Sequence, residues 1–147
     1  MAYSLEQVLA DWKIDAEISA SKLDKELYRT PMLHAKYLDA YVYFRAKLSA
    51  AEKKYNHMTF ARKKYYRGES TQEELALYGW SQYQGLKMSS SEFNQQKEFD
   101  PILVDLNEVR DGYKVAVTAI EYIMKSIGGR DWTLKTIVDY QKFQAGN

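Results

Sequence analysis

The chain has no cysteine, only two prolines and seven glycines, and no long apolar run. The absence of cysteine excludes a disulfide framework and a thiolate metal site, and it fits an intracellular protein. No apolar stretch approaches the ~20 residues that a membrane span requires, and the first residues, MAYSLE, lack the layout of a signal peptide. We therefore expect a soluble protein that has no membrane partner.

The few prolines and glycines stand where helices begin or end, which predicts an all-α fold. The longest periodic segment spans residues 31–67, about 50 Å of helix at 1.5 Å per residue. Its apolar positions alternate between spacings of three and four, as in a heptad seam. The predicted seam consists of His34, Tyr37, Tyr41, Phe44, Leu48, Ala51, Tyr55, Met58, Arg62 and Tyr65.

A second long helix is predicted over residues 100–127, opened by Asp100 and Pro101 and closed by Gly128 and Gly129. The two helices imply an antiparallel hairpin or a bundle between subunits. The seam of the second helix consists of Leu103, Leu106, Arg110, Tyr113, Val117, Ile120, Met124 and Ile127.

Shorter helices are expected to flank this long helical hairpin, over residues 3–13, 21–28 and 71–78. Thr30 and Pro31 indicate either a fresh helix start or a kink. Residues 79–96 are expected to form a polar connection. A terminal helix over residues 131–146 either packs back on the monomer or docks on a neighbour.

Residues 53–67 form the least ordinary stretch, because six Lys or Arg residues alternate with four aromatic residues and no acid interrupts them. Residues 1–70 hold 13 Lys/Arg and 9 Asp/Glu, whereas residues 71–147 hold 8 and 11, so the positive charge is local to one part of a chain of net charge +1. Cations and rings together suit single-stranded nucleic acid, whose phosphates attract cations and whose bases stack on rings.

Helical phasing places Lys53, His57, Phe60, Lys64 and Arg67 on an outward stripe, opposite the seam. Phe60 lies in the middle of this stripe, where a base can stack on it. The alternative is that the cations are ordinary solvated residues and Phe60 meets another helix. A basic helix lying on an anionic membrane is a weaker alternative, because the face opposite the cations is already a packing seam.

Arg62 is a charge at a seam position. Either it pairs with a carboxylate on a facing helix, or the seam opens near this end and Arg62 reaches into a groove.

Nothing in the sequence indicates catalysis. His34 and His57 have no second ligand at metal-binding spacing, and the chain has no phosphate loop and no nucleophile elbow. We expect a binding protein that uses no metal or other cofactor.

Three stretches together resemble the UvsY family of T4-like bacteriophages, the recombination mediator proteins. They are SKLDKELYRTPMLHAKYL at residues 21–38, FARKKYYRG at residues 60–68 and DWTLKTIVDYQKFQAG at residues 131–146. The stretch at residues 60–68 is similar to the family's DNA-binding motif, Lys-Ala-Arg-x-x-Tyr-Tyr-x-Gly. Arg62 carries over directly from that motif. Its lysine falls on Phe60, a departure, and we expect Lys63 and Lys64 to supply the missing charge from adjacent faces.

The resemblance implies a single helical domain, with residues 1–70 binding DNA and residues 71–147 packing and assembling. It further implies a homo-oligomeric ring in the host cytoplasm whose partners are single-stranded DNA, the phage recombinase and the phage single-strand-binding protein. The expected DNA-binding residues are Lys53, Lys54, His57, Phe60, Arg62, Lys63, Lys64, Tyr65, Tyr66 and Arg67. The expected oligomerisation residues are Trp132, Leu134, Ile137, Val138, Tyr140 and Phe143.

Two other functions fit the same residues. A helical scaffold or adaptor, such as a virion component, needs the seams and leaves the basic segment incidental. A plain single-strand-binding protein uses the basic segment without the protein partners.

Overall fold

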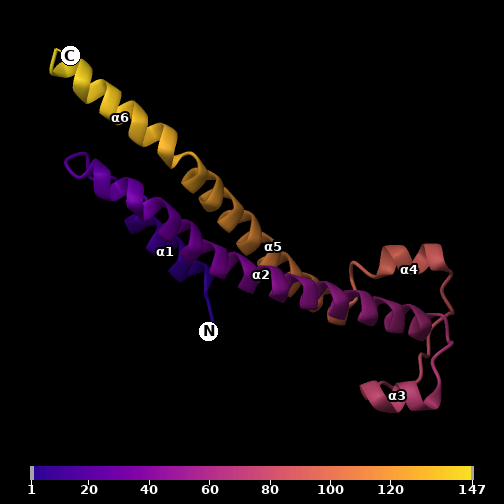
Figure 1. Cartoon of the computed structure of the whole chain (residues 1–147). Coiled ribbons are helices and arrows are strands. Elements are labelled where there is room, and N and C mark those ends of the chain that lie inside the picture. Colours follow the sequence, from indigo (N-terminus) through magenta and orange to yellow (C-terminus); the bar gives the residue numbers. More distant parts are fainter. Residues whose placement is uncertain (1, 147) are drawn as a thin grey trace. The chain divides into compact units, whose positions relative to one another are not determined.

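The computed structural model describes residues 2–146, and these residues contain helices, turns and bends but no strand. The predicted all-α fold is confirmed (Figure 1). The helices are α1 (Leu5–Asp15), α2 (Leu23–Tyr66), α3 (Gln72–Tyr78), α4 (Ser90–Gln96), α5 (Pro101–Gly128) and α6 (Arg130–Gln144).

Side-chain caps define where four of these helices begin. Ser4, Thr71 and Ser89 each accept a hydrogen bond from the backbone N–H three residues later, at α1, α3 and α4. The Asp100 carboxylate accepts from the N–H groups of Ile102 and Leu103, so Asp100 caps α5 as the sequence predicted. The backbone N–H groups in the first turn of a helix have no acceptor within the helix, and these side chains supply one.

Proline does not interrupt α2, which runs through Pro31 from Leu23 onward. The alternative of a fresh helix start at this point is therefore wrong. A proline inside a helix costs about 3 kcal/mol, because it lacks the N–H and crowds the preceding turn. In the turn that precedes the proline, Arg130 donates to the Glu26 carbonyl and to the Thr30 hydroxyl.

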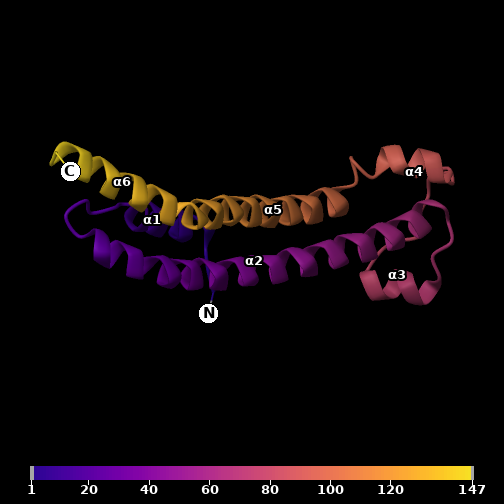
Figure 2. The same cartoon turned by 45° about the horizontal axis from the view of Figure 1, so that its top comes forward.

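The chain divides into two compact units, and we describe each by itself. Unit 1 holds the described residues up to Lys47 and from Tyr113 onward, and so includes α1, α6 and segments of α2 and α5. Figure 2 shows α1 running alongside α2, where Lys36 and Tyr37 donate hydrogen bonds to Asp15. The pairs Tyr41–Glu121 and Thr30–Arg130 fix the antiparallel sense of its long helices. The buried core consists of Val8, Leu33, Tyr37, Ala40, Phe44, Ala116, Val117, Ile120, Ile123, Ile127 and Leu134.

This core corrects the predicted seam at one point. Leu33 is buried and its neighbour His34 is exposed, so the seam enters α2 one residue earlier than predicted. A leucine gains more from burial than a histidine, whose ring nitrogens need partners.

A buried ion pair joins the first turns of α2 and α6. Arg130 donates to Glu26 Oε2 at 3.0 Å, and Arg29 donates to the same carboxylate at 2.8 Å. Burial alone raises the pKa of Glu26, but the bonds from Arg130 and Arg29 outweigh it and the pKa lies below its ordinary value. These contacts hold the start of α6 against α2.

Unit 2 spans Leu48–Gly112 and contains the rest of α2 and α5 together with α3 and α4. Its pairs Tyr55–Arg110 and Arg62–Asp100 again run antiparallel. The predicted polar connection over residues 79–96 is wrong in its second half, where α4 forms behind the Ser89 cap and buries Phe93. The core consists of Tyr66, Phe93 and Leu103, with Tyr55, Met58, Tyr65, Tyr83 and Met88 packed against it.

Candidate nucleic-acid interface

The basic segment forms the last turns of α2 and ends at Gly68. The φ angle of Gly68 is 71°, a left-handed conformation that glycine adopts without strain. A Cβ at Gly68 would lie 2.9 Å from Cε of the flexible Lys87 side chain, which can shift, so the φ angle is the feature that favours glycine. The turn ends the helix immediately after its cationic residues.

Three of the five residues of the predicted outward stripe face solvent: Lys53, His57 and Phe60 are exposed, and Phe60 is 64% exposed. The other two, Lys64 and Arg67, are half-buried. The alternative that Phe60 packs on another helix is not seen among the described residues. Lys64 Nζ lies 5.9 Å from the centre of the Phe60 ring. A shallow hollow of about 230 Å³ is lined by Phe60, Lys63, Lys64, Arg67 and Glu69.

Two cations of this face have acidic partners in unit 2. Lys64 Nζ lies 2.7 Å from Glu74 Oε1, and the bond from Lys64 lowers the pKa of Glu74. Arg67 lies 3.2 Å from Glu69 and also donates to the Ser90 hydroxyl at 2.6 Å. In contrast, Lys53, Lys54 and Lys63 make no ion pair within residues 2–146.

The opposite side of the segment carries three predicted DNA-binding residues into the core. Arg62 and Tyr66 are each 8% exposed, and Tyr65 is half-buried with its hydroxyl donating to the Ser81 carbonyl. Arg62 Nε and Nη2 each lie 2.8 Å from Asp100 Oδ2. Of the two alternatives for Arg62, pairing with a carboxylate on a facing helix is confirmed.

Asp100 is fully buried, at 0% exposure. Burial raises the pKa of its carboxyl, but hydrogen bonds from Tyr66, Arg62 and the Leu103 N–H outweigh burial, so the pKa is lowered. Burial and the same carboxylate raise the pKa of Tyr66. Sequence reasoning identified Asp100 as a helix cap but missed it as the partner of Arg62.

Aromatic residues after the basic segment were also missed as part of this site. Trp80 lies 5.3 Å from Tyr65, and Tyr83 lies 5.5 Å from Tyr65 and 5.2 Å from Tyr66, measured between ring centres. The available signal was the presence of Trp80, Tyr83 and Phe93 in an otherwise polar stretch. Large aromatic side chains are usually at least partly buried, so these three rings indicated a packing site. They support the end of α2 from the inner side.

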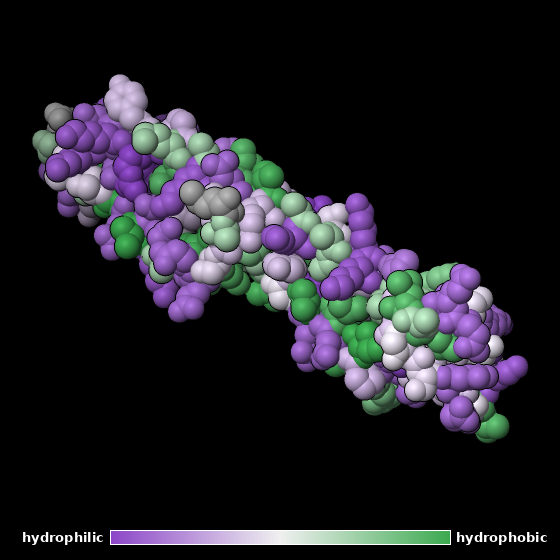
Figure 3. Space-filling model, turned by 90° about the horizontal axis from the view of Figure 1, so that it is seen from below, coloured by the Kyte–Doolittle hydropathy of each residue, from purple (hydrophilic) through white to green (hydrophobic). Residues whose placement is uncertain are grey.

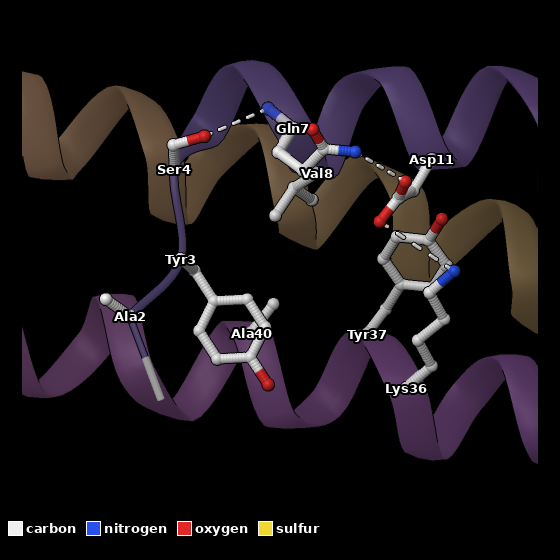
Figure 4. Close-up of a pocket in the computed structure, with 9 residues that line it drawn as sticks. All are labelled: Ala2, Tyr3, Ser4, Gln7, Val8, Asp11, Lys36, Tyr37 and Ala40. Carbon is white, nitrogen blue, oxygen red and sulfur yellow. Dashed lines mark hydrogen bonds and ion pairs between the residues drawn. The ribbon is translucent and has the colours of Figure 1, made fainter.

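A larger hollow, of about 490 Å³, lies in unit 1 between α1 and α2. In Figure 4 Tyr3, Val8 and Ala40 line it, and its lysine, Lys36, points toward Asp11. Lys36 Nζ is 2.7 Å from Asp15 and 3.9 Å from Asp11. With its cation already neutralised, this hollow does not suit a polyanion.

Hydrophobic exposure singles out no DNA surface by itself. On the face shown in Figure 3, green hydrophobic residues reach the surface at several places among purple hydrophilic ones.

The predicted oligomerisation residues of α6 separate into two sets. Leu134 is buried, and Ile137 and Val138 are half-buried, whereas Trp132, Tyr140 and Phe143 are exposed.

Other kinds of site find little support. Residues 2–146 hold no group of three or more His, Cys, Asp and Glu side chains suited to a metal ion. Of the helices described, none combines the length and the apolar character needed to cross a membrane.

Comparisons with known proteins agree with this architecture. The crystal structure of the bacteriophage T4 recombination mediator protein UvsY in lattice type II matches with a TM-score of 0.82 and 21% identity, covering 98% of this chain and 99% of that one. The type IV lattice gives 0.81 and 20%, covering 96% and 99%. At these identities the likeness establishes the fold. A search of the curated proteins finds no match.

The sequence profile described as "Recombination, repair and ssDNA binding protein UvsY" matches residues 11–147, which is nearly the whole chain and includes the basic segment and α6. The chain therefore belongs to the UvsY family.

Proposed function

We propose that this protein is a recombination mediator that binds single-stranded DNA through the outer face of the end of α2. The observation that carries the proposal is Phe60, an exposed ring surrounded by Lys63, Lys64 and Arg67. Membership of a non-enzymatic family confirms the expectation that the chain is not an enzyme.

The proposed face combines two kinds of contact. Contacts between phosphates and cations give an affinity that falls as the salt concentration rises. Stacking of a base on an aromatic ring gives an affinity that depends much less on salt. The residues proposed to touch DNA are Lys53, Lys54, His57, Phe60, Lys63, Lys64 and Arg67. Tyr65 and Tyr66 hold this face from the core side.

Phe60→Ala is expected to weaken binding to a fluorescent oligo-dT by roughly 1 to 3 kcal/mol, the usual contribution of one stacked base. The slope of log K against log salt should stay unchanged, since no cation is removed. Phe99→Ala is a matched control, because Phe99 is also an exposed phenylalanine of unit 2 but lies outside the face. Unchanged affinity in Phe60→Ala would exclude stacking on this ring.

Glu74→Gln is expected to strengthen binding by a few-fold at most, because an ion pair near the surface contributes little. DNA must displace Glu74 from Lys64, and glutamine removes that competition. Glu73→Gln is the matched control, because it makes the same charge change one residue away, and Glu73 forms no ion pair within residues 2–146. Equal titrations of the two variants would mean that Lys64 does not bind phosphate.

We propose further that copies of the chain associate through α6 into a ring. A single face makes few phosphate contacts and binds weakly at physiological salt, whereas linked faces engage one strand at high effective concentration. Loading the phage recombinase onto DNA coated by the single-strand-binding protein is the function proposed for the assembly.

The deciding experiment is a titration of labelled single-stranded DNA at two salt concentrations, combined with gel filtration. Salt-dependent binding by an oligomer supports the proposal, and absence of binding contradicts it. Nucleation of the cognate recombinase on coated DNA then separates a mediator from a plain single-strand-binding protein.

A further inference from the structure

Arg62 is enclosed by a carboxylate and three aromatic rings of unit 2. Its guanidinium carbon lies 4.7, 4.9 and 4.6 Å from the ring centres of Tyr65, Tyr66 and Trp80. Nε and Nη2 bond to Asp100 Oδ2, and Nη2 also donates to the Tyr66 hydroxyl at 3.0 Å. The planar, forked shape of arginine suits such a site, where lysine would not replace it.

The partners of Arg62 are themselves fully engaged. Asp100 Oδ1 accepts from the N–H groups of Ile102 and Leu103, and Oδ2 accepts from Arg62 and from the Tyr66 hydroxyl at 2.7 Å. Turning Arg62 out to a phosphate would leave a fully buried carboxylate without its counter-charge, which is strongly unfavourable. A phosphate offers Arg62 little that Asp100 does not already supply.

Neighbouring cations lie in a different setting. Lys63 is half-buried, lines the Phe60 hollow and has no acidic partner within residues 2–146. It follows Arg62 directly, so the helix turns the two side chains to faces about 100° apart. Of these two adjacent cations, Lys63 is the one that can reach a phosphate.

We propose that Arg62, the arginine of the family's motif, is a positioning residue that does not touch DNA. It fixes the last turns of α2 against the start of α5, and so presents Phe60 and Lys63 to the strand. This inference rests on the proposed function of the same face, and it assigns Arg62 a role different from the phosphate contact that the resemblance implies.

Asp100→Asn gives opposite results under the two roles. Asparagine keeps the cap of α5 but releases Arg62 from its ion pair. If Arg62 positions α2, affinity for oligo-dT stays the same or falls, and the salt slope does not increase. If Arg62 is a phosphate ligand held back by Asp100, affinity rises and the slope steepens by about 0.7.

Arg62→Met and Lys63→Met are a matched pair of variants, because each removes one cation and the two positions are adjacent. Lys63→Met should reduce the slope by about 0.7, which over a fourfold rise in salt is about a 2.6-fold smaller loss of affinity. Arg62→Met should leave the slope unchanged, and adding Asp100→Asn should restore part of any lost affinity, because the buried carboxylate no longer lacks a partner. Circular dichroism establishes whether each variant is folded. If Arg62→Met does not fold, the titration of Asp100→Asn tests the role of Arg62 by itself.

The results also separate this inference from the proposed function. An unmodified chain that does not bind DNA contradicts the proposed function. A chain that binds, loses slope at Lys63→Met and gains slope at Asp100→Asn contradicts only the positioning role of Arg62.

Discussion

Asp100→Ala is expected to lower the free energy of unfolding by about 3 to 5 kcal/mol, the cost of leaving one partner of a buried ion pair alone. Loss of the α5 cap adds about 1 kcal/mol. Asp100 is fully buried and Arg62 nearly so, hence water cannot replace the lost carboxylate. Chemical denaturation at neutral pH followed by circular dichroism measures the change.

Acid should remove the same contribution from the unmodified chain. The pKa of Asp100 is lowered in the folded state, so its carboxylate stabilises the fold above the ordinary value of 3.8 and stops doing so as pH falls through the folded value. The difference between the unmodified chain and Asp100→Ala should therefore shrink below about pH 4.

Asp105→Ala is the matched control, because Asp105 is an exposed aspartate on α5 without an ion pair within the described residues. It should change stability by no more than about 0.5 kcal/mol. An Asp100→Ala chain as stable as this control would show that the buried pair contributes nothing.

The sequence predicted most of the helices because their apolar residues repeat over many turns. Periodicity predicted α2 and α5, and caps predicted their ends at Asp100 and Gly68. It could not settle Pro31, since the side chain that bonds to the neighbouring Thr30 is Arg130, which lies 100 residues away in the sequence. The residues around Pro31 in the sequence do not indicate this distant partner.

The candidate site was predictable in part for the same reason. The exposure of Phe60 follows from helical phasing alone, whereas Arg62 needed Asp100, 38 residues further along the chain. Phasing offered two settings for Arg62 and could not choose between them. Phe93 was missed as a core residue because α4 is short and polar except for that ring.

The exposed side of α6 is the second place where a large effect is expected. Trp132 and Phe143 are 72% and 78% exposed and lie about three turns apart, which puts them on one face. Leu134 is buried on the opposite side, and Gln141 there donates to the Ala20 carbonyl. The helix thus uses one side within unit 1 and leaves large apolar side chains on the other, as expected of a surface that meets another copy.

Replacing both Trp132 and Phe143 by serine is therefore expected to convert the proposed ring to a monomer and to lower affinity for a long single strand by about 100-fold or more. Helix content should not change, because neither side chain packs in the core. Gln144→Ser, a neutral change at an exposed position of α6, should keep both properties. Light scattering and the oligonucleotide titration are measured on the same samples. A monomeric double variant that binds DNA at full strength would contradict the dependence of affinity on assembly, and an oligomeric one would place the subunit contact elsewhere.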